Sequence, residues 1–111
     1  MTARELDAMV AEKVMGREVI KRPYSDEGPC LRAVDSRQWV PMPFYSTDIG
    51  SAWEVVEKMA DKGFYASIQN CHTPISDWCV VLANGKDAFE AEGAFPRAAC
   101  LAALRAVGVE L

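Results

Sequence analysis

The sequence contains few of the side chains from which catalytic and metal sites are usually built. Its only histidine is His72, and its 111 residues include no CxxC pair, no HExxH motif and no glycine-rich phosphate loop with a following lysine. A zinc site needs about four ligands at recognisable spacing, and Cys30, Cys71 and His72 are too scattered to predict one. We therefore expect no catalytic residues, no metal ion and no cofactor.

An enzyme stays open as an alternative. Cys71 and His72 are adjacent, and adjacent side chains in an extended segment point apart. They are therefore not expected to form a nucleophile–base pair. An enzyme would instead need His72 in a cleft, within hydrogen-bonding reach of another cysteine or of a carboxylate. Cys79 and Cys100 lie inside apolar runs, which is typical of small buried hydrophobic residues.

Long apolar segments are also missing. No apolar run approaches the ~20 residues needed to span a bilayer, and residues 1–7 contain no apolar core of a signal peptide. We expect a cytoplasmic protein, with reduced cysteines and no membrane partner. The length of 111 residues fits one domain over residues 1–111.

Negative charge is concentrated in the second part of the chain. The net charge is −4; residues 1–45 carry seven basic and seven acidic side chains, whereas residues 46–111 carry five basic and nine acidic ones. An acidic surface disfavours direct binding of nucleic acid and suits a basic protein partner. The alternative is an ordinary solvated surface.

Three segments have the apolar spacing of helices, at about 2–15, 47–62 and 96–107. The first opens with a capping box over Thr2 to Glu5. The second can be capped by Ser46 or Thr47, and Trp53 in its apolar stripe is expected in the core. The third begins at Pro96, and its many alanines predict close packing against a sheet.

Three further segments predict antiparallel strands, at about 64–69, 77–83 and 86–92. The first alternates polar and apolar residues, as a half-buried strand does. The segment Trp78 to Ala83 is apolar at every position, which predicts cover on both faces.

A hairpin is expected at Asn84-Gly85, where a two-residue turn would connect the last two strands. Such a turn places Val80 opposite Phe89 and puts both on one face of the sheet. It also places Glu90 opposite Cys79.

The fold class that follows is α+β: a three-layer α/β/α sandwich with an antiparallel sheet of at least three strands and helices on both faces. Residues 17–45 form an irregular or variable segment within this domain, interrupted by four prolines. Short extended pieces are expected at 18–21, 31–34 and 38–40. Segments of this length are functional, disordered or wrongly interpreted.

Three separated blocks resemble the phage ABA-sandwich domain family. The block PFYSTDIGSAWEVVEKM at 43–59 looks like the family's signature, LDAMVAEKVMG at 6–16 resembles its usual start, and FPRAACLAALRAVG at 95–108 resembles its usual close. Residues 17–42 match least. The resemblance implies a small protein encoded by a bacteriophage or prophage, with helices on both sides of a sheet. It implies no catalytic residues.

The favoured hypothesis is a non-enzymatic phage accessory protein that binds and inhibits a host protein. Its most specific form is a counter-defence inhibitor, such as an anti-CRISPR, whose acidic surface blocks the nucleic-acid-binding surface of a defence effector. The partner-binding residues would be five carboxylates: Glu54, Glu57, Asp87, Glu90 and Glu92.

Two other functions stay open. A small-ligand binder could sequester a nucleotide immune signal, because aromatic residues and arginines are interleaved before the second helix. Its site would comprise Arg22, Tyr24, Arg32, Arg37, Trp39 and Tyr45. The same cluster could instead pack the irregular segment onto the domain. The other open function is that of a structural protein of the phage. The sequence is also compatible with a homo-oligomer.

Overall fold

The computed structural model describes residues 2–17, 19–20, 30–32, 39–70 and 78–109. The elements in chain order are α1 (Ala3–Lys13), β1 (Val19–Ile20), β2 (Cys30–Arg32), β3 (Trp39–Pro41), α2 (Ile49–Asp61), β4 (Tyr65–Asn70), β5 (Trp78–Ala83), β6 (Ala88–Gly93) and α3 (Phe95–Ala106). They form two antiparallel sheets, in the orders β1-β2-β3 and β4-β5-β6. The predicted α+β class is confirmed. The three helices and the strands β4, β5 and β6 each begin and end within two residues of their expected bounds.

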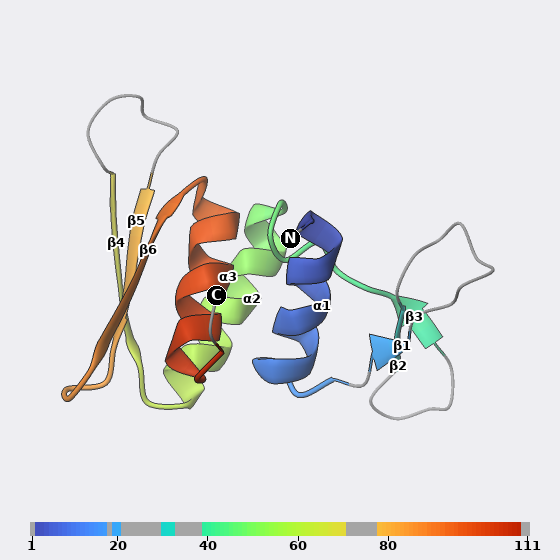
Figure 1. Ribbon diagram of the computed structural model, residues 1–111, viewed down its shortest axis with the longest axis horizontal. Helices are drawn as coiled ribbons and strands as arrows, with labels where there is room; N and C mark the ends of the chain where they lie inside the picture. Colours follow the sequence, from blue (N-terminus) through green and yellow to red (C-terminus); the bar gives the residue numbers. More distant parts are fainter. Residues whose placement is uncertain (1, 18, 21–29, 33–38, 71–77, 110–111) are drawn as a thin grey trace.

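The irregular segment 17–45 contributes the small sheet β1-β2-β3. Its strands overlap the three extended pieces that were expected there. The sheet lies beside α1, at the opposite end of the molecule from β4-β5-β6 (Figure 1). None of the described helices is long and apolar enough to cross a membrane.

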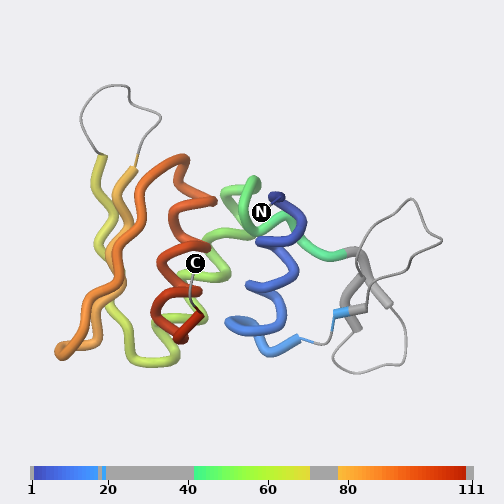
Figure 2. The backbone as a smooth tube through the Cα atoms, in the orientation of Figure 1, coloured from blue at the N-terminus to red at the C-terminus, as the bar shows by residue number. Residues whose placement is uncertain are grey.

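The order of the layers differs from the expectation of helices on both faces of the main sheet. Helices α2 and α3 both lie on one face of β4-β5-β6, and α1 lies beyond them (Figures 1 and 2). An antiparallel sheet can leave its second face open to water. The apolar run of β5 is tolerated there because its outward residues, Cys79, Val81 and Ala83, are small and only half-buried.

The core lies between the sheet and the three helices. Val80, Leu82 and Ala91 point from the sheet toward α3, and all are buried. Helix α3 is central: it packs against β5, β6, α2 and α1. Its buried alanines, among them Ala98 and Ala102, allow this close approach. The predicted packing of an alanine-rich helix on a sheet is confirmed.

Only part of the apolar stripe of α2 faces the core. Val55 and Met59 are fully buried, whereas Trp53 is 47% exposed and Ile49 is 61% exposed. The prediction that Trp53 is a core residue is therefore wrong. Its ring instead lies at the rim of the helix pair, with its centroid 5.5 Å from that of Phe95.

The hairpin between β5 and β6 has a four-residue turn, not the two-residue turn that was expected. Ala83 pairs with Ala88 and Val80 with Ala91, a shift of two residues. The side chain of Asn84 stabilises the wider turn, because its Oδ1 accepts hydrogen bonds from the backbone N–H of Lys86 (2.9 Å) and of Asp87 (2.8 Å). A shift of two preserves the faces of the strand, so Phe89 still shares a face with Val80.

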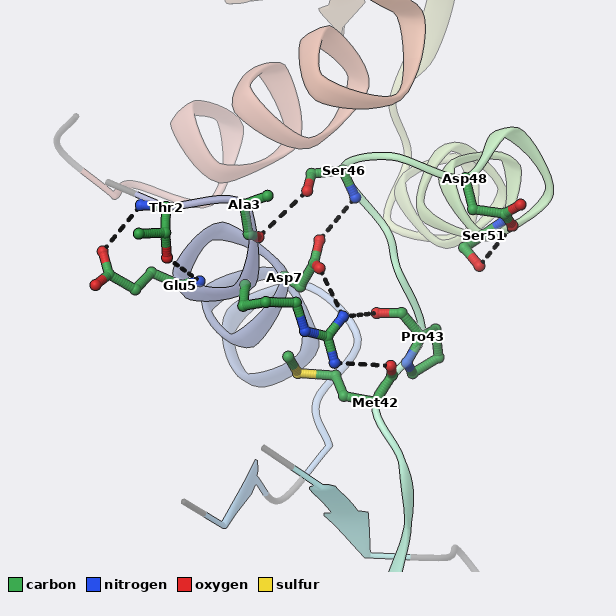
Figure 3. Close-up of polar contacts among 10 residues, drawn as sticks. Thr2, Ala3, Glu5, Asp7, Met42, Pro43, Ser46, Asp48 and Ser51 are labelled. Carbon is green, nitrogen blue, oxygen red and sulfur yellow. Dashed lines mark hydrogen bonds and ion pairs between the residues drawn. The ribbon is translucent and has the colours of Figure 1, made fainter. Parts of the chain in front are cut away.

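A buried polar cluster joins α1 to the segment that leads into α2 (Figure 3). Asp7 is fully buried; it accepts a hydrogen bond from the backbone N–H of Ser46 (2.7 Å) and one from Arg4 Nη1 (2.9 Å). Arg4 also donates to the carbonyls of Met42 (3.1 Å) and Pro43 (3.4 Å). We call Arg4, Asp7 and Ser46 the polar clasp, because it fixes where α2 begins relative to α1.

The helix caps match the sequence in one case and differ in the other. Thr2 and Glu5 form the predicted capping box of α1. The N-cap of α2 is Asp48, not Ser46 or Thr47, and Asp48 accepts hydrogen bonds from Ser51 N–H (2.8 Å) and Ser51 Oγ (2.9 Å). Ser46 is used in the polar clasp instead. The hydrogen bonds from Ser51 lower the pKa of Asp48, because they favour its ionised form.

Candidate functional site: the open face of the sheet

The face of β4-β5-β6 that points away from α2 and α3 is the candidate site, and we call it the outer face. Strand alternation and the observed pairing arrange its nine side chains in three rows across the sheet. The rows are Tyr65–Ala83–Ala88, Ser67–Val81–Glu90 and Gln69–Cys79–Glu92. In the described part of the chain, no helix lies over this face (Figure 1).

The outer face combines apolar area with negative charge. Tyr65 is 77% exposed, Val81 is half-buried in the middle row, and Glu90 and Glu92 are exposed on β6. None of its nine side chains is basic. The two carboxylates therefore give this face a negative potential beside a small apolar surface, a combination typical of sites that bind a positively charged protein surface.

Cys79 brings a thiol to the same face. Its Sγ lies 3.4 Å from Glu90 Oε1, to which it donates a hydrogen bond. The thiol and the carboxylates of Glu90 and Glu92 offer three ligand atoms within 4.8 Å of one another. A structural zinc site takes four ligands in a closed shell, and these three groups lie on an open strand surface, so we assign no metal ion to them.

The five predicted partner-binding carboxylates do not form one surface. Glu90 and Glu92 lie together on the outer face, and Asp87 lies in the turn that precedes β6. Glu54 and Glu57 are exposed on α2, which packs on the other side of the sheet. The acidic surface expected from the sequence is therefore divided between the sheet and a helix.

The structure places three of the six residues of the predicted ligand-binding cluster: Tyr45, Arg32 and Trp39. Tyr45 is only 1% exposed and packs in the core; burial raises its pKa, and the nearby negative charge of Glu54 adds to this effect. It is a core residue and offers no ring to a ligand. Arg32 and Trp39 are cross-strand neighbours on β2 and β3. Three members lie outside the described residues: Arg22, Tyr24 and Arg37.

Two of the residues considered for catalysis or zinc, Cys71 and His72, lie outside the described residues, and Cys30 begins β2. Cys100 is buried, and burial raises the pKa of its thiol to about 12. Such a thiol stays neutral at physiological pH and is a poor nucleophile.

Cys79 and Val81 were not expected at a site, because the apolar run of β5 was interpreted as wholly buried. Tyr65 was expected on the polar side of a half-buried strand and was given no functional role. A signal for the open face was present. Glu90 and Glu92 alternate along β6 with Phe89 and Ala91. Polar residues at every second position of an edge strand indicate that this face of the strand is exposed to water. Paired residues of neighbouring strands lie on the same face of the sheet, so the corresponding face of β5 is exposed as well.

A second feature without a sequence signal is an apolar groove between α2 and the sheet. It is lined by Ile49, Trp53, Ile68, Trp78 and Phe95 and has a volume of about 230 Å³. The exposed sides of Ile49 and Trp53 form one wall. The groove lies on the helix side of the sheet, so it is separate from the outer face.

A comparison with known families decides the classification. The family described as "Phage ABA sandwich domain" matches residues 8–104. The chain belongs to this family. The phage ABA sandwich domain therefore covers nearly the whole chain, and the three blocks that resemble the family meet in space: the polar clasp joins the first block to the second, and α3 of the third block packs on both helices.

A solved structure agrees with this classification. The chain is similar to a phage protein from Bacillus cereus ATCC 14579, known from a 2.0 Å crystal structure, with 26% sequence identity and a TM-score of 0.77. The match covers 100% of this chain and 92% of that one. No curated protein matches the chain.

Proposed function

We propose that this phage ABA sandwich protein is a non-enzymatic accessory protein that binds a host protein through its outer face. The observation that carries the proposal is the open face itself, where none of the nine side chains is basic. Glu90 and Glu92 lie beside Val81 and Cys79 of β5, and Tyr65 is exposed on β4, the far strand of the same face. A negative surface attracts a basic partner, and the apolar side chains supply area that can be removed from water on contact.

The geometry of the outer face indicates what its partner offers. Glu90 and Glu92 are two residues apart on one strand, so their side chains leave the sheet about 7 Å apart. A partner with two cationic side chains at this spacing and an apolar side chain between them matches the face. Basic surfaces that bind nucleic acid carry such cations. A host defence effector with a surface of this kind is the partner class that we favour.

The test uses two double charge reversals. E90K/E92K changes the outer face, and E54K/E57K makes the same change in net charge on α2. The tagged wild-type protein and both variants are used to capture proteins from a lysate of a bacterial host, and a partner is then purified and rebound. The proposal predicts that E54K/E57K retains the partner and E90K/E92K loses it. Equal loss in both variants, or no partner retained by the wild-type protein, overturns it.

Counter-defence is tested separately in cells. The protein is expressed in a host whose nucleic-acid-targeting defence restricts a phage, and plaques are counted. The proposal predicts that the wild-type protein restores plaque formation and that E90K/E92K does not. A partner that binds through the outer face without any restoration of plaques would overturn the counter-defence role and leave the binding function standing.

A further inference from the structure

The two edges of the main sheet differ in how they are protected. In the order β4-β5-β6, strands β4 and β6 are the edges. Strand β6 carries Glu90 and Glu92, and Arg105 of α3 donates a hydrogen bond to the carbonyl of Glu90. Charged side chains on an edge strand discourage another strand from pairing with it. The β6 edge is therefore protected against strand addition.

The β4 edge has none of these protections. Its sequence, YASIQN, contains no charged residue, no proline and no glycine. Because no residue is a proline, every second residue presents a backbone N–H at the edge that faces away from β5, and no described strand pairs with that edge. An edge of this kind is a template for a further strand.

The apolar groove reaches the same strand. Ile68 of β4 lines the groove together with Ile49 and Trp53 of α2, and these two α2 side chains are 61% and 47% exposed. Neither β4 nor the lining of the groove carries a charged side chain. An uncharged strand edge and an exposed apolar wall thus lie close together on an acidic protein.

We propose that the β4 edge binds a second copy of this chain. The two β4 strands pair antiparallel about a two-fold axis, which joins the sheets of the two copies into one sheet of six strands. Antiparallel pairing of a strand with itself is self-complementary, as a two-fold interface must be. The chain has a net charge of −4, so two copies repel except where charge is absent, and β4 with the groove is such a surface.

The size of the contact explains why the groove belongs to it. A strand of six residues is about 20 Å long, and pairing two such strands alone falls short of the roughly 1,200 Å² that stable interfaces bury. Covering Ile49 and Trp53 of both copies supplies the missing apolar area. The dimer leaves the outer face open, so this inference does not rest on the proposed function.

The test measures the oligomeric state by sedimentation equilibrium. Ser67 and Ala88 are both exposed residues on the outer face of an edge strand, one on β4 and one on β6. In the proposed dimer, S67K brings the lysine side chains of the two copies close together across the two-fold axis, so that they repel each other. A88K places its lysine on β6, away from the interface. Circular dichroism confirms that each variant is folded. A third variant, W53E, puts a charge on the wall of the groove.

The expected result is a wild-type dimer at micromolar concentration. S67K and W53E should each raise the Kd of the dimer by about tenfold or more, and A88K should leave it unchanged. A wild-type protein that sediments as a monomer overturns the inference. A dimer that S67K does not weaken, or that A88K weakens as much, places the interface elsewhere and overturns it equally.

Discussion

Both faces of β5 carry only apolar residues, but their surroundings differ. Val80 and Leu82 are buried against the helices, whereas Cys79, Val81 and Ala83 are half-buried on the outer face. The difference shows that a continuous apolar run does not require cover on both sides. In an antiparallel sheet, small side chains on the open face are partly shielded by neighbouring strands. That face remains available for a partner.

The largest expected contrast between the two sides of the molecule is in thiol reactivity. Cys79 lies on the outer face, whereas Cys100 is buried with a pKa raised from 9.0 to about 12. At pH 8 a thiol with this pKa is almost wholly protonated and is a poor nucleophile. Alkylation of the native protein with iodoacetamide, mapped by peptide mass spectrometry, should modify Cys79 and leave Cys100 unmodified. Equal labelling of both would contradict the assigned faces.

The next contrast is in stability, and adjacent valines provide a matched pair. V80A removes two methyl groups from the core, and the cost is about 3 kcal/mol of unfolding free energy. V81A removes the same atoms from the half-exposed face and should cost about 1 kcal/mol or less. Urea unfolding of both variants measures the difference. A cost for V81A that equals the cost for V80A would mean that the outer face is covered.

A buried and an exposed carboxylate on α1 extend the comparison to polar side chains. D7A leaves the N–H of Ser46 and the guanidinium of Arg4 without their carboxylate, at a cost of about 2 kcal/mol. E12A removes an exposed side chain whose ion pair with Lys13 spans 3.8 Å, and its effect should lie within about 0.5 kcal/mol. Thermal or urea unfolding checks both. If D7A and E12A lowered the unfolding free energy equally, the polar clasp would not stabilise the fold.

The smallest effect concerns pH and the exposed cap of α2. The pKa of Asp48 is lower in the folded state than in the unfolded chain, because Ser51 donates two hydrogen bonds to its carboxylate. Its contribution to stability is therefore present above the unfolded pKa of 3.8 and is lost as pH falls through the lower folded value. The stability difference between the wild type and D48A should be larger at pH 6 than at pH 3. A difference that grows toward pH 3 would contradict this sign.

The sequence predicted the main elements because their signals are local. The capping box of Thr2 and Glu5 and the alternation of β4 lie within a few residues of each other. The polar clasp was not predicted, because Asp7 and Ser46 are 39 residues apart. The hairpin register was wrong, because the side chain of Asn84 stabilises a longer turn at a position where Asn-Gly favours a shorter one.

The candidate site was only partly predictable. Glu90 and Glu92 are visible as acidic residues on a strand, but sequence cannot show that they lie apart from Glu54 and Glu57. That separation depends on α2 packing on the opposite face of the sheet. The apolar side chains that share the outer face with them, Val81 and Tyr65, come from two other strands. Val81 lies beside Glu90, and Tyr65 lies on the same face, only because of the pairing register.

Binding through the outer face is tested most directly by the affinity of the captured partner for the two charge-reversal variants. Isothermal titration calorimetry at 50 and 300 mM salt compares the wild-type protein, E90K/E92K and E54K/E57K. If the partner binds the outer face, E90K/E92K should weaken binding by about a hundredfold at low salt, with less effect at high salt, and E54K/E57K should change it by less than about threefold. Equal weakening by both variants would contradict the claim that the outer face is the binding surface.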